Sequence, residues 1–412
     1  MISGKADCGL AYAVKRSGSA VAYCALSIHC GTRNEAGFHK GIAHFTEHTL
    51  FKGTAKRRAS VINSYLERLG GELNAFTTKE EIVFHATVLR EDLNKAADLL
   101  FELATSPTFP EHEIETEKGV VIDEIHSYKD SPSEDIYDKF EEMMFEGHPL
   151  STNILGTTAS VKRINREELL KFVKEKFTPD KMAFTIVADI DEKRMEKLIL
   201  KMAGEVFGNV STTEEDKPNE PAVEQPKALP FDKTLNKRNH QANCIIGGLA
   251  PSLYQERERL ATVLLCNILG GPANNSILNS VLREKHGWVY GVECSYTQFA
   301  DTGLVAISLG CDKTNVEKCI NAIEKEISKL QAEPLSERKL KAAKKQLLGQ
   351  LAISGDNGET QCLSMGKSLL AYGKITGGKE TKSLIDGITA KDIQEMTQNI
   401  FASEKLSKLI YI

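Results

Sequence analysis

Alternating hydrophobic and polar positions recur over short segments in the first half of the chain. They predict strands at Ala20–His29, Glu72–Thr77 and Glu81–Leu89, and a nearly continuous apolar run predicts another at Met182–Ala188. Successive side chains of a strand point to opposite faces, so period-two alternation is typical of a half-buried strand. Hairpin-length gaps between these strands favour an antiparallel or mixed sheet over a Rossmann fold.

Apolar positions three and four residues apart predict helices between the strands. These helices cover about Lys40–Phe51, Ala59–Leu69, Arg90–Leu103 and Pro110–Tyr128. Strands and helices in this order define an α+β fold. We expect the helices to cover one face of the sheet.

A similar pattern returns in the second half of the chain. Ser60–Leu66 resembles Ser276–Leu282, which lies 216 residues further on. An alternating stretch at Gly303–Leu309 and an amphipathic stretch at Asn315–Leu330 then follow in the same order. We interpret the chain as two copies of one α+β unit, each a mainly antiparallel sheet covered by helices.

One segment, 209–231, departs from the globular pattern. It is rich in proline and acidic residues and has few large apolar residues until its end. This composition is typical of a linker. The sequence therefore predicts a first domain at 1–208 and a homologous second domain at 232–412.

The composition excludes several classes of protein. The chain is 41% hydrophobic and 26% charged with a formal net charge of −5, which does not favour nucleic acid or an anionic membrane as partner. No apolar run is long enough to span a bilayer, and the N-terminus lacks a signal-peptide pattern. Nine cysteines without a CxxC pair favour reduced thiols. We therefore expect a cytoplasmic protein.

The candidate chemistry lies in His44-Phe45-Thr46-Glu47-His48. On a helix, His44 and His48 are one turn apart and share a face, an arrangement that suits tetrahedral zinc. Glu47 projects to the same side and can take a proton from a water molecule at the metal. This order, HxxEH, is the inverse of the commoner HExxH motif.

A catalytic zinc needs a third protein ligand and an open position. Glu117 and Glu124 are two helical turns apart and therefore share a face. One of them can bind the metal while the other supports the ligand shell or a substrate amine. On spacing alone, Asp123 and Glu113 remain alternatives for the third ligand.

The second copy serves as an internal control. At the 216-residue offset, His44, Glu47 and His48 align with the apolar Leu260, Val263 and Leu264. A buried helix with two histidines and a glutamate is costly unless these groups are paired or bind metal. The pattern assigns function to the first half and a scaffold role to the second.

At these residues the chain resembles the pitrilysin family of inverted-zincin metallopeptidases, most closely the half-length bacterial members similar to mitochondrial processing peptidase. The resemblance is strongest over Gly31–Thr77, Glu113–Asp130 and Leu265–Tyr296. It implies one zinc ion per chain, bound by the two histidines of the motif together with Glu124. It also implies that Glu117 is an accessory carboxylate.

The resemblance further implies a substrate site. Asn74, Ala75 and Phe76 would lie on an edge strand that holds a peptide by β-augmentation. Arg283 and Tyr290 would hydrogen-bond the substrate carbonyl or the oxyanion. Full-length relatives enclose the zinc with four such units, so a chain of two units implies a homodimer in which this pair acts on the partner's zinc, with a heterodimer as the alternative.

The predicted function is that of a zinc-dependent endopeptidase or oligopeptidase acting on short, unfolded peptides, with Glu47 as general base. The alternative is a non-catalytic or partner-dependent subunit of a heterodimeric peptidase with a structural zinc. Manganese or cobalt could replace zinc, because nitrogen and oxygen ligands discriminate poorly among these ions.

Overall fold

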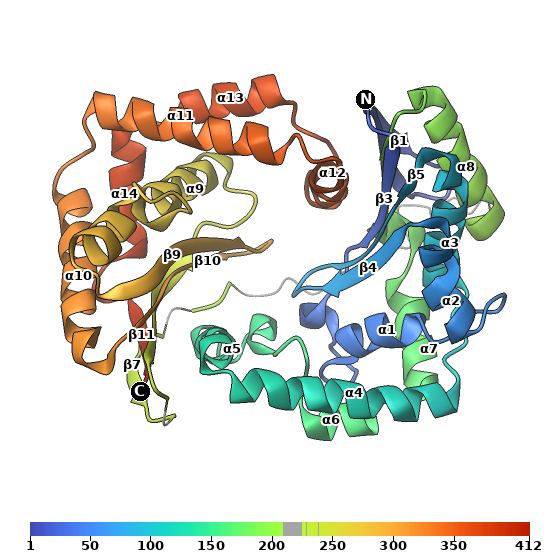
Figure 1. Cartoon of the computed structure of the whole chain (residues 1–412), viewed down its shortest axis with the longest axis horizontal. Coiled ribbons are helices and arrows are strands. Elements are labelled where there is room, and N and C mark those ends of the chain that lie inside the picture. The colour runs from blue at the N-terminus through green and yellow to red at the C-terminus, as the bar shows by residue number, and fades with distance from the viewer. Residues whose placement is uncertain (209–224, 228, 238) are drawn as a thin grey trace. The chain divides into compact units, whose positions relative to one another are not determined.

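The computed structural model describes residues 1–208, 225–227, 229–237 and 239–412. Their contacts divide the chain into two compact units, each built around one sheet (Figure 1). The first unit contains Met1–His126, 152–208 and Ile353–Thr376, and the second contains the remaining described residues. Each unit is described separately below.

The first unit holds a six-stranded sheet in the order β1-β2-β6-β3-β5-β4. Only β2 and β6 run parallel; the other neighbours are antiparallel. The strand β4 forms one edge and pairs with β5 alone among the described strands. The strands are β1 (Ile2–Lys5), β2 (Ala11–Arg16), β3 (Val21–Ile28), β4 (Glu72–Thr77), β5 (Ile82–Leu89) and β6 (Met182–Ala188).

Helices α3 and α8 pack on one face of this sheet, where Phe101 stacks on Phe184 with ring centroids 4.7 Å apart. The helix α1 lies against β4 and β5 at the edge of the sheet. The predicted helices are present, with ends shifted by a few residues. The helices of this part of the chain are α1 (Ile42–Leu50), α2 (Ala59–Tyr65), α3 (Leu93–Thr105), α4 (Glu111–Asp130), α6 (Thr158–Arg163), α7 (Arg166–Lys176) and α8 (Glu192–Phe207).

The opposite face of the first sheet is also covered, so the expectation of helices on one face only was wrong. The covering helix is α12 (Gly358–Tyr372), which comes from the second half of the chain and packs on β2, β3 and β6 (Figure 1). Small side chains on the strands let the helix approach closely, and Cys362, Met365 and Leu369 fill the interface. This explains why every residue of β6 is buried.

The second unit repeats this arrangement with a five-stranded sheet in the order β7-β11-β8-β10-β9. Helix α5 (Pro132–Met144), from the first half of the chain, covers one face of it: Phe140 packs with Ile245, Leu409 and Tyr411. The strands are β7 (Asp232–Leu235), β8 (Ala242–Ala250), β9 (Val289–Gln298), β10 (Gly303–Cys311) and β11 (Ser407–Tyr411). The remaining helices are α9 (Glu256–Gly270), α10 (Val316–Ala332), α11 (Glu337–Ser354), α13 (Gly378–Asp386), α14 (Ala390–Ile400) and the π-helical turn η7 (Asn279–Lys285).

The α+β class and the duplicated unit are confirmed. The compact units do not coincide with the two halves of the sequence, because each half contributes one helix to the sheet of the other. The predicted linker 209–231 lies mostly outside the described residues. All nine cysteines lie within the described residues, are buried and form no disulfide there. No helix within the described residues is both long and apolar enough to cross a bilayer.

The contact of α12 with β3 gives a first prediction. A Cβ atom on Gly366 would lie 2.5 Å from Ser27 Oγ and 3.4 Å from Ser27 Cβ. We expect Gly366→Ala to lower the free energy of unfolding by about 1–3 kcal/mol through overpacking. The buried Ser27 Oγ has no hydrogen-bond partner among the described residues, so Ser27→Ala alone costs little. Urea unfolding of both single variants and the double variant measures the coupling, and additive effects would contradict the packing argument.

Candidate metal centre

The helix α1 owes its position to its apolar residues. Ile42, Phe45 and Leu50 are fully buried in the core of the first unit. The polar positions of the same helix are set by that packing: His44 is buried, while Glu47 and His48 are half-buried. Burial of these apolar residues therefore turns the side of α1 that carries the HxxEH motif toward α4.

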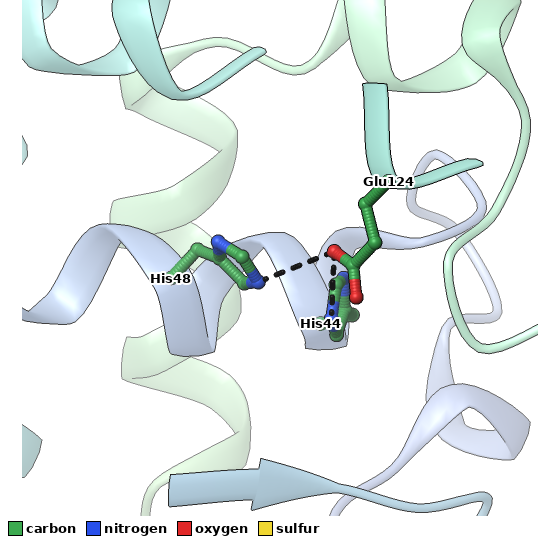
Figure 2. Close-up of side chains that lie close together, drawn as sticks. All are labelled: His44, His48 and Glu124. Carbon is green, nitrogen blue, oxygen red and sulfur yellow. Dashed lines mark ion pairs between the residues drawn. The ribbon is translucent and has the colours of Figure 1, made fainter. Parts of the chain in front are cut away.

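Two histidines of α1 converge on one carboxylate of α4. The Nε2 atoms of His44 and His48 lie 3.8 and 3.6 Å from the same oxygen of Glu124, Oε2 (Figure 2). These three residues form the only group of three histidine, cysteine or acidic residues within the described chain whose ligand atoms all lie within 4.8 Å of one another. In tetrahedral zinc with bonds of about 2.0–2.1 Å, neighbouring ligand atoms are about 3.3–3.4 Å apart, close to these separations.

The hydrogen bonding of Glu124 tests whether a cation fits here. Its Oε2 is buried and has no hydrogen-bond partner among the described residues. The distances of 3.6 and 3.8 Å to the histidines are too long for hydrogen bonds. A buried carboxylate oxygen without a donor is costly, and a divalent cation between the three ligand atoms would remove that cost. The donor set therefore fits zinc.

The second carboxylate of α4, Glu117, contacts the other ring nitrogen of His48. His48 Nδ1 donates to Glu117 Oε1 at 2.9 Å, and Lys52 Nζ lies 2.7 Å from the other oxygen of Glu117. This contact fixes the tautomer that leaves Nε2 of His48 available to a metal. The contact is compatible with the predicted role of Glu117 as an accessory carboxylate, which stays a prediction. Of the alternatives for the third ligand, Asp123 is exposed and Glu113 lies 3.5 Å from His112.

The surroundings shift the pKa values of the two histidines in opposite directions. Burial, and secondarily the nearby His48, lower the pKa of His44 to about 3, so its ring is neutral, as a metal ligand must be. Burial also lowers the pKa of His48. The hydrogen bond to Glu117 and the charges of Glu47, Glu124 and Glu117 outweigh that effect, so its net pKa is raised without metal. Burial raises the pKa of Glu124, against the charge of His48.

Glu47 is oriented by the end of the edge strand. The hydroxyl of Thr77, the last residue of β4, donates to Glu47 Oε2 at 2.6 Å. Burial raises the pKa of Glu47, while the bond from Thr77 and the charge of His48 act in the opposite direction. A carboxylate with a raised pKa beside a metal site is suited to accept and return a proton near neutral pH.

The predicted substrate residues lie on the same edge strand, β4. Asn74 and Phe76 are exposed and Ala75 is half-buried, which follows the alternation of the strand. The backbone of β4 pairs with β5 on one side only among the described strands, so its other side can accept a further strand. Thr77 belongs to the same alternation and connects this strand to the proposed base.

Arg283 and Tyr290 belong to the second unit. Arg283 lies on η7, Tyr290 is 75% exposed at the start of β9, and both line a cavity of about 780 Å³. Tyr137 of α5 and Gly271 also line this cavity. The structure therefore brings the two residues together with each other, and their action on a metal centre stays a prediction.

The sequence analysis missed two residues of the first unit that contact the site, Thr77 and Lys52. Lys52 is four residues after His48, so helical spacing and a charge opposite to that of Glu117 could have indicated it. The contact of Thr77 with Glu47 joins a strand to a helix 30 residues apart, and no local pattern reports such a contact.

Comparison with known proteins agrees with the fold. The family described as "Insulinase (Peptidase family M16)" matches residues 12–158, and "Peptidase M16 inactive domain" matches residues 163–347. The chain belongs to the M16 family of peptidases, which confirms the resemblance drawn from the HxxEH region.

Similar proteins are known from several bacteria. An uncharacterized zinc protease of Rickettsia bellii is 30% identical and covers 92% of this chain and 90% of its own length. The uncharacterized zinc protease YmxG of Bacillus subtilis is 27% identical over 93% of this chain and 91% of its own length. These names associate zinc with the family.

Solved structures show the same fold at lower identity. A protease from Helicobacter pylori superposes with a TM-score of 0.90 at 19% identity, covering 100% of this chain and 98% of that one. A peptidase M16 inactive domain from Pseudomonas fluorescens gives a TM-score of 0.87 at 17% identity, covering 100% of this chain and 97% of that one.

The contact between His48 and Glu117 gives a second prediction. We expect Glu117→Gln to weaken zinc binding about 10–100-fold, because the amide no longer fixes His48 with a full negative charge. Competition with a chelator measures the dissociation constant. Glu115→Gln, on the exposed side of the same helix, is the matched control and keeps the wild-type affinity. Equal zinc affinities of Glu117→Gln and Glu115→Gln would show that Glu117 does not support the metal centre.

Proposed function

We propose that this chain is a zinc-dependent endopeptidase or oligopeptidase that hydrolyses short, unfolded peptides. The observation that carries the proposal is the convergence of two histidine Nε2 atoms on the unpartnered Oε2 of Glu124, beside Glu47. Three protein ligands leave one position of a tetrahedral zinc open, as catalysis requires. Zinc in this position would acidify a water molecule and polarise the peptide carbonyl.

The protein side chains then supply the proton transfers and the positioning. Glu47 accepts a proton from the attacking water and delivers it to the leaving amine nitrogen. Thr77 holds one carboxylate oxygen of Glu47, so the other stays directed at the reacting groups. Glu117 and Lys52 keep His48 in a single tautomer throughout.

The free edge of β4 supports an extended peptide as substrate. A peptide added as a further strand would form main-chain hydrogen bonds, which do not depend on its sequence, while side-chain pockets would set specificity. Asn74, Ala75 and Phe76 would line that strand. A segment that pairs in this way must be extended and must have a free backbone edge, which favours short, unfolded peptides as substrates.

The function of Glu47 gives a third prediction. Glu47→Gln keeps the size of the side chain but removes the base. We expect the variant to bind one zinc per chain as wild type does and to lose at least about a hundredfold in kcat on a library of quenched 10–30-residue peptides. Zinc content by elemental analysis and peptide cleavage are measured on the same samples.

Two outcomes of that assay would contradict the proposal. Zinc binding without cleavage by either protein would support the alternative, a non-catalytic or partner-dependent subunit with a structural metal. If wild type does not bind zinc, the proposed metal site is contradicted. Glu72→Gln, an exposed carboxylate at the far end of β4, serves as control for the loss of one negative charge.

We further propose that the active form is a homodimer in which Arg283 and Tyr290 of one chain act on the peptide held at the zinc of the other. Both residues have polar groups suited to a substrate carbonyl or a developing oxyanion, and both line one cavity of the second unit. A heterodimer with a zinc-free partner is the alternative.

Complementation between inactive chains gives a fourth prediction. Glu47→Gln and Arg283→Ala chains are each inactive, but a mixed dimer contains one site with an intact base and an intact arginine from different chains. We expect mixing under subunit exchange to restore up to about a quarter of the activity, the statistical share of intact sites. A tagged capture of the mixed dimer verifies the exchange. A captured mixed dimer without activity would contradict action across chains.

A further inference from the structure

The helix that carries the zinc ligands lacks a side-chain cap of its own. Its N-cap residue is Gly41, in the left-handed region at φ 87°, which has no side chain to accept the first N–H groups of α1. These groups need acceptors, since the first turn of a helix leaves its N–H groups without intrahelical partners. The acceptor comes from a preceding loop residue, Glu35.

The carboxylate of Glu35 binds the start of α1 with both oxygens. Oε2 accepts from Gly41 N at 2.9 Å, and Oε1 accepts from Ala43 N at 3.0 Å. Glu35 is 6% exposed, so these bonds are shielded from water. Two bonds to two different backbone groups fix the rotation of the first turn as well as its position.

His44 follows Ala43 directly and lies in that first turn. The direction of its Cα–Cβ bond is therefore set by the backbone that Glu35 holds. His48 is one turn further on and has its own support from Glu117, whereas Nδ1 of His44 has no hydrogen-bond partner among the described residues. The orientation of the His44 ring therefore depends on the position of the first turn of α1 and on packing.

The surroundings leave little freedom to this helix start. A Cβ on Gly41 would lie 2.7 Å from the carbonyl oxygen of Leu155, so two backbone segments cross closely here. Two residues before Gly41, the N–H of His39 donates to Glu168 at 2.8 Å. The same carboxylate lies 2.9 Å from His39 Nδ1. Two carboxylates therefore hold the segment that leads into α1.

Burial of Glu35 has an energetic consequence. Burial raises the pKa of its carboxyl to about 8, against the N–H groups of Ala43 and Gly41 and the charges of Lys79 and Lys40. A buried acid of this kind adds little net stability, because its desolvation offsets the bonds it makes. Its clear structural effect is geometric.

We propose that Glu35 is a positioning residue for the metal centre: it fixes the first turn of α1 and thereby directs His44 at the position shared with His48 and Glu124. This inference rests on the proposed zinc site. It assigns to a loop glutamate, which touches neither metal nor substrate, a measurable part of the metal affinity.

The test compares two helix caps in the full chain. Glu35→Gln replaces one acceptor oxygen by an amide group that faces an N–H. The control is Asp191→Ala, since Asp191 caps α8 by accepting from Lys193 N and Arg194 N, alanine removes that cap, and α8 carries no site residue. Glu35→Asp keeps the charge but is one methylene shorter, and it serves if Glu35→Gln does not fold.

The measurements are made at about pH 9, where the carboxyl of Glu35 is ionised and accepts with both oxygens. They are the zinc dissociation constant, the Tm of the zinc-free protein and hydrogen exchange of the Ala43 amide. We expect Glu35→Gln to weaken zinc binding about tenfold and to speed exchange at Ala43, with Glu35→Asp in between. Asp191→Ala lowers Tm through the loss of the α8 cap but keeps the wild-type zinc affinity.

The outcomes separate this inference from the function on which it rests. If wild type binds zinc and the Glu35 variants bind it within twofold of wild type, the inference is overturned while the zinc site stands. If both Glu35→Gln and Asp191→Ala weaken zinc binding in proportion to their loss of Tm, Glu35 acts only on stability, and the inference is likewise overturned. If wild type does not bind zinc, the proposed function fails and the inference fails with it.

Discussion

The site depends on one buried carboxylate oxygen that no hydrogen-bond donor satisfies among the described residues. Glu124 Oε2 faces the Nε2 atoms of two histidines, at separations too long for hydrogen bonds and close to those of ligands around one metal ion. Three polar groups held together in a buried place without mutual bonds are unfavourable in themselves. The neighbouring contacts are consistent with this constraint, since Glu117 holds one histidine and Thr77 holds the adjacent Glu47.

The sequence predicted the local elements and the shared helix face of His44 and His48 because both leave short-range patterns. The strands β4 and β6 have the predicted bounds, and the HxxEH spacing brings His44 and His48 to one face of a helix. The third metal ligand could not be chosen from periodicity among the candidates Glu113, Glu117, Asp123 and Glu124. Helical spacing alone does not say which side of α4 faces α1. Contacts between distant elements, such as Thr77 with Glu47 and Glu35 with the start of α1, leave no periodic signal.

The duplication also explains how one copy can carry chemistry and the other none. The helix α9 corresponds to α1, and Leu264, which aligns with His48, is buried in the apolar core of the second unit. The same fold thus tolerates either an apolar helix or one with three polar groups at that position. In the second case the polar groups require a compensating partner, and α4 provides it with Glu124 and Glu117.

The position of α12 in the sequence has a consequence for folding of the chain during translation. The last strand of the first sheet ends at Ala188, and the helix that covers one face of that sheet begins only at Gly358. Translation at roughly 5–20 residues per second leaves this apolar face open for about 10–35 s after the strands have emerged. During that interval the nascent chain exposes the alanine-rich surface of β2, β3 and β6 to solvent.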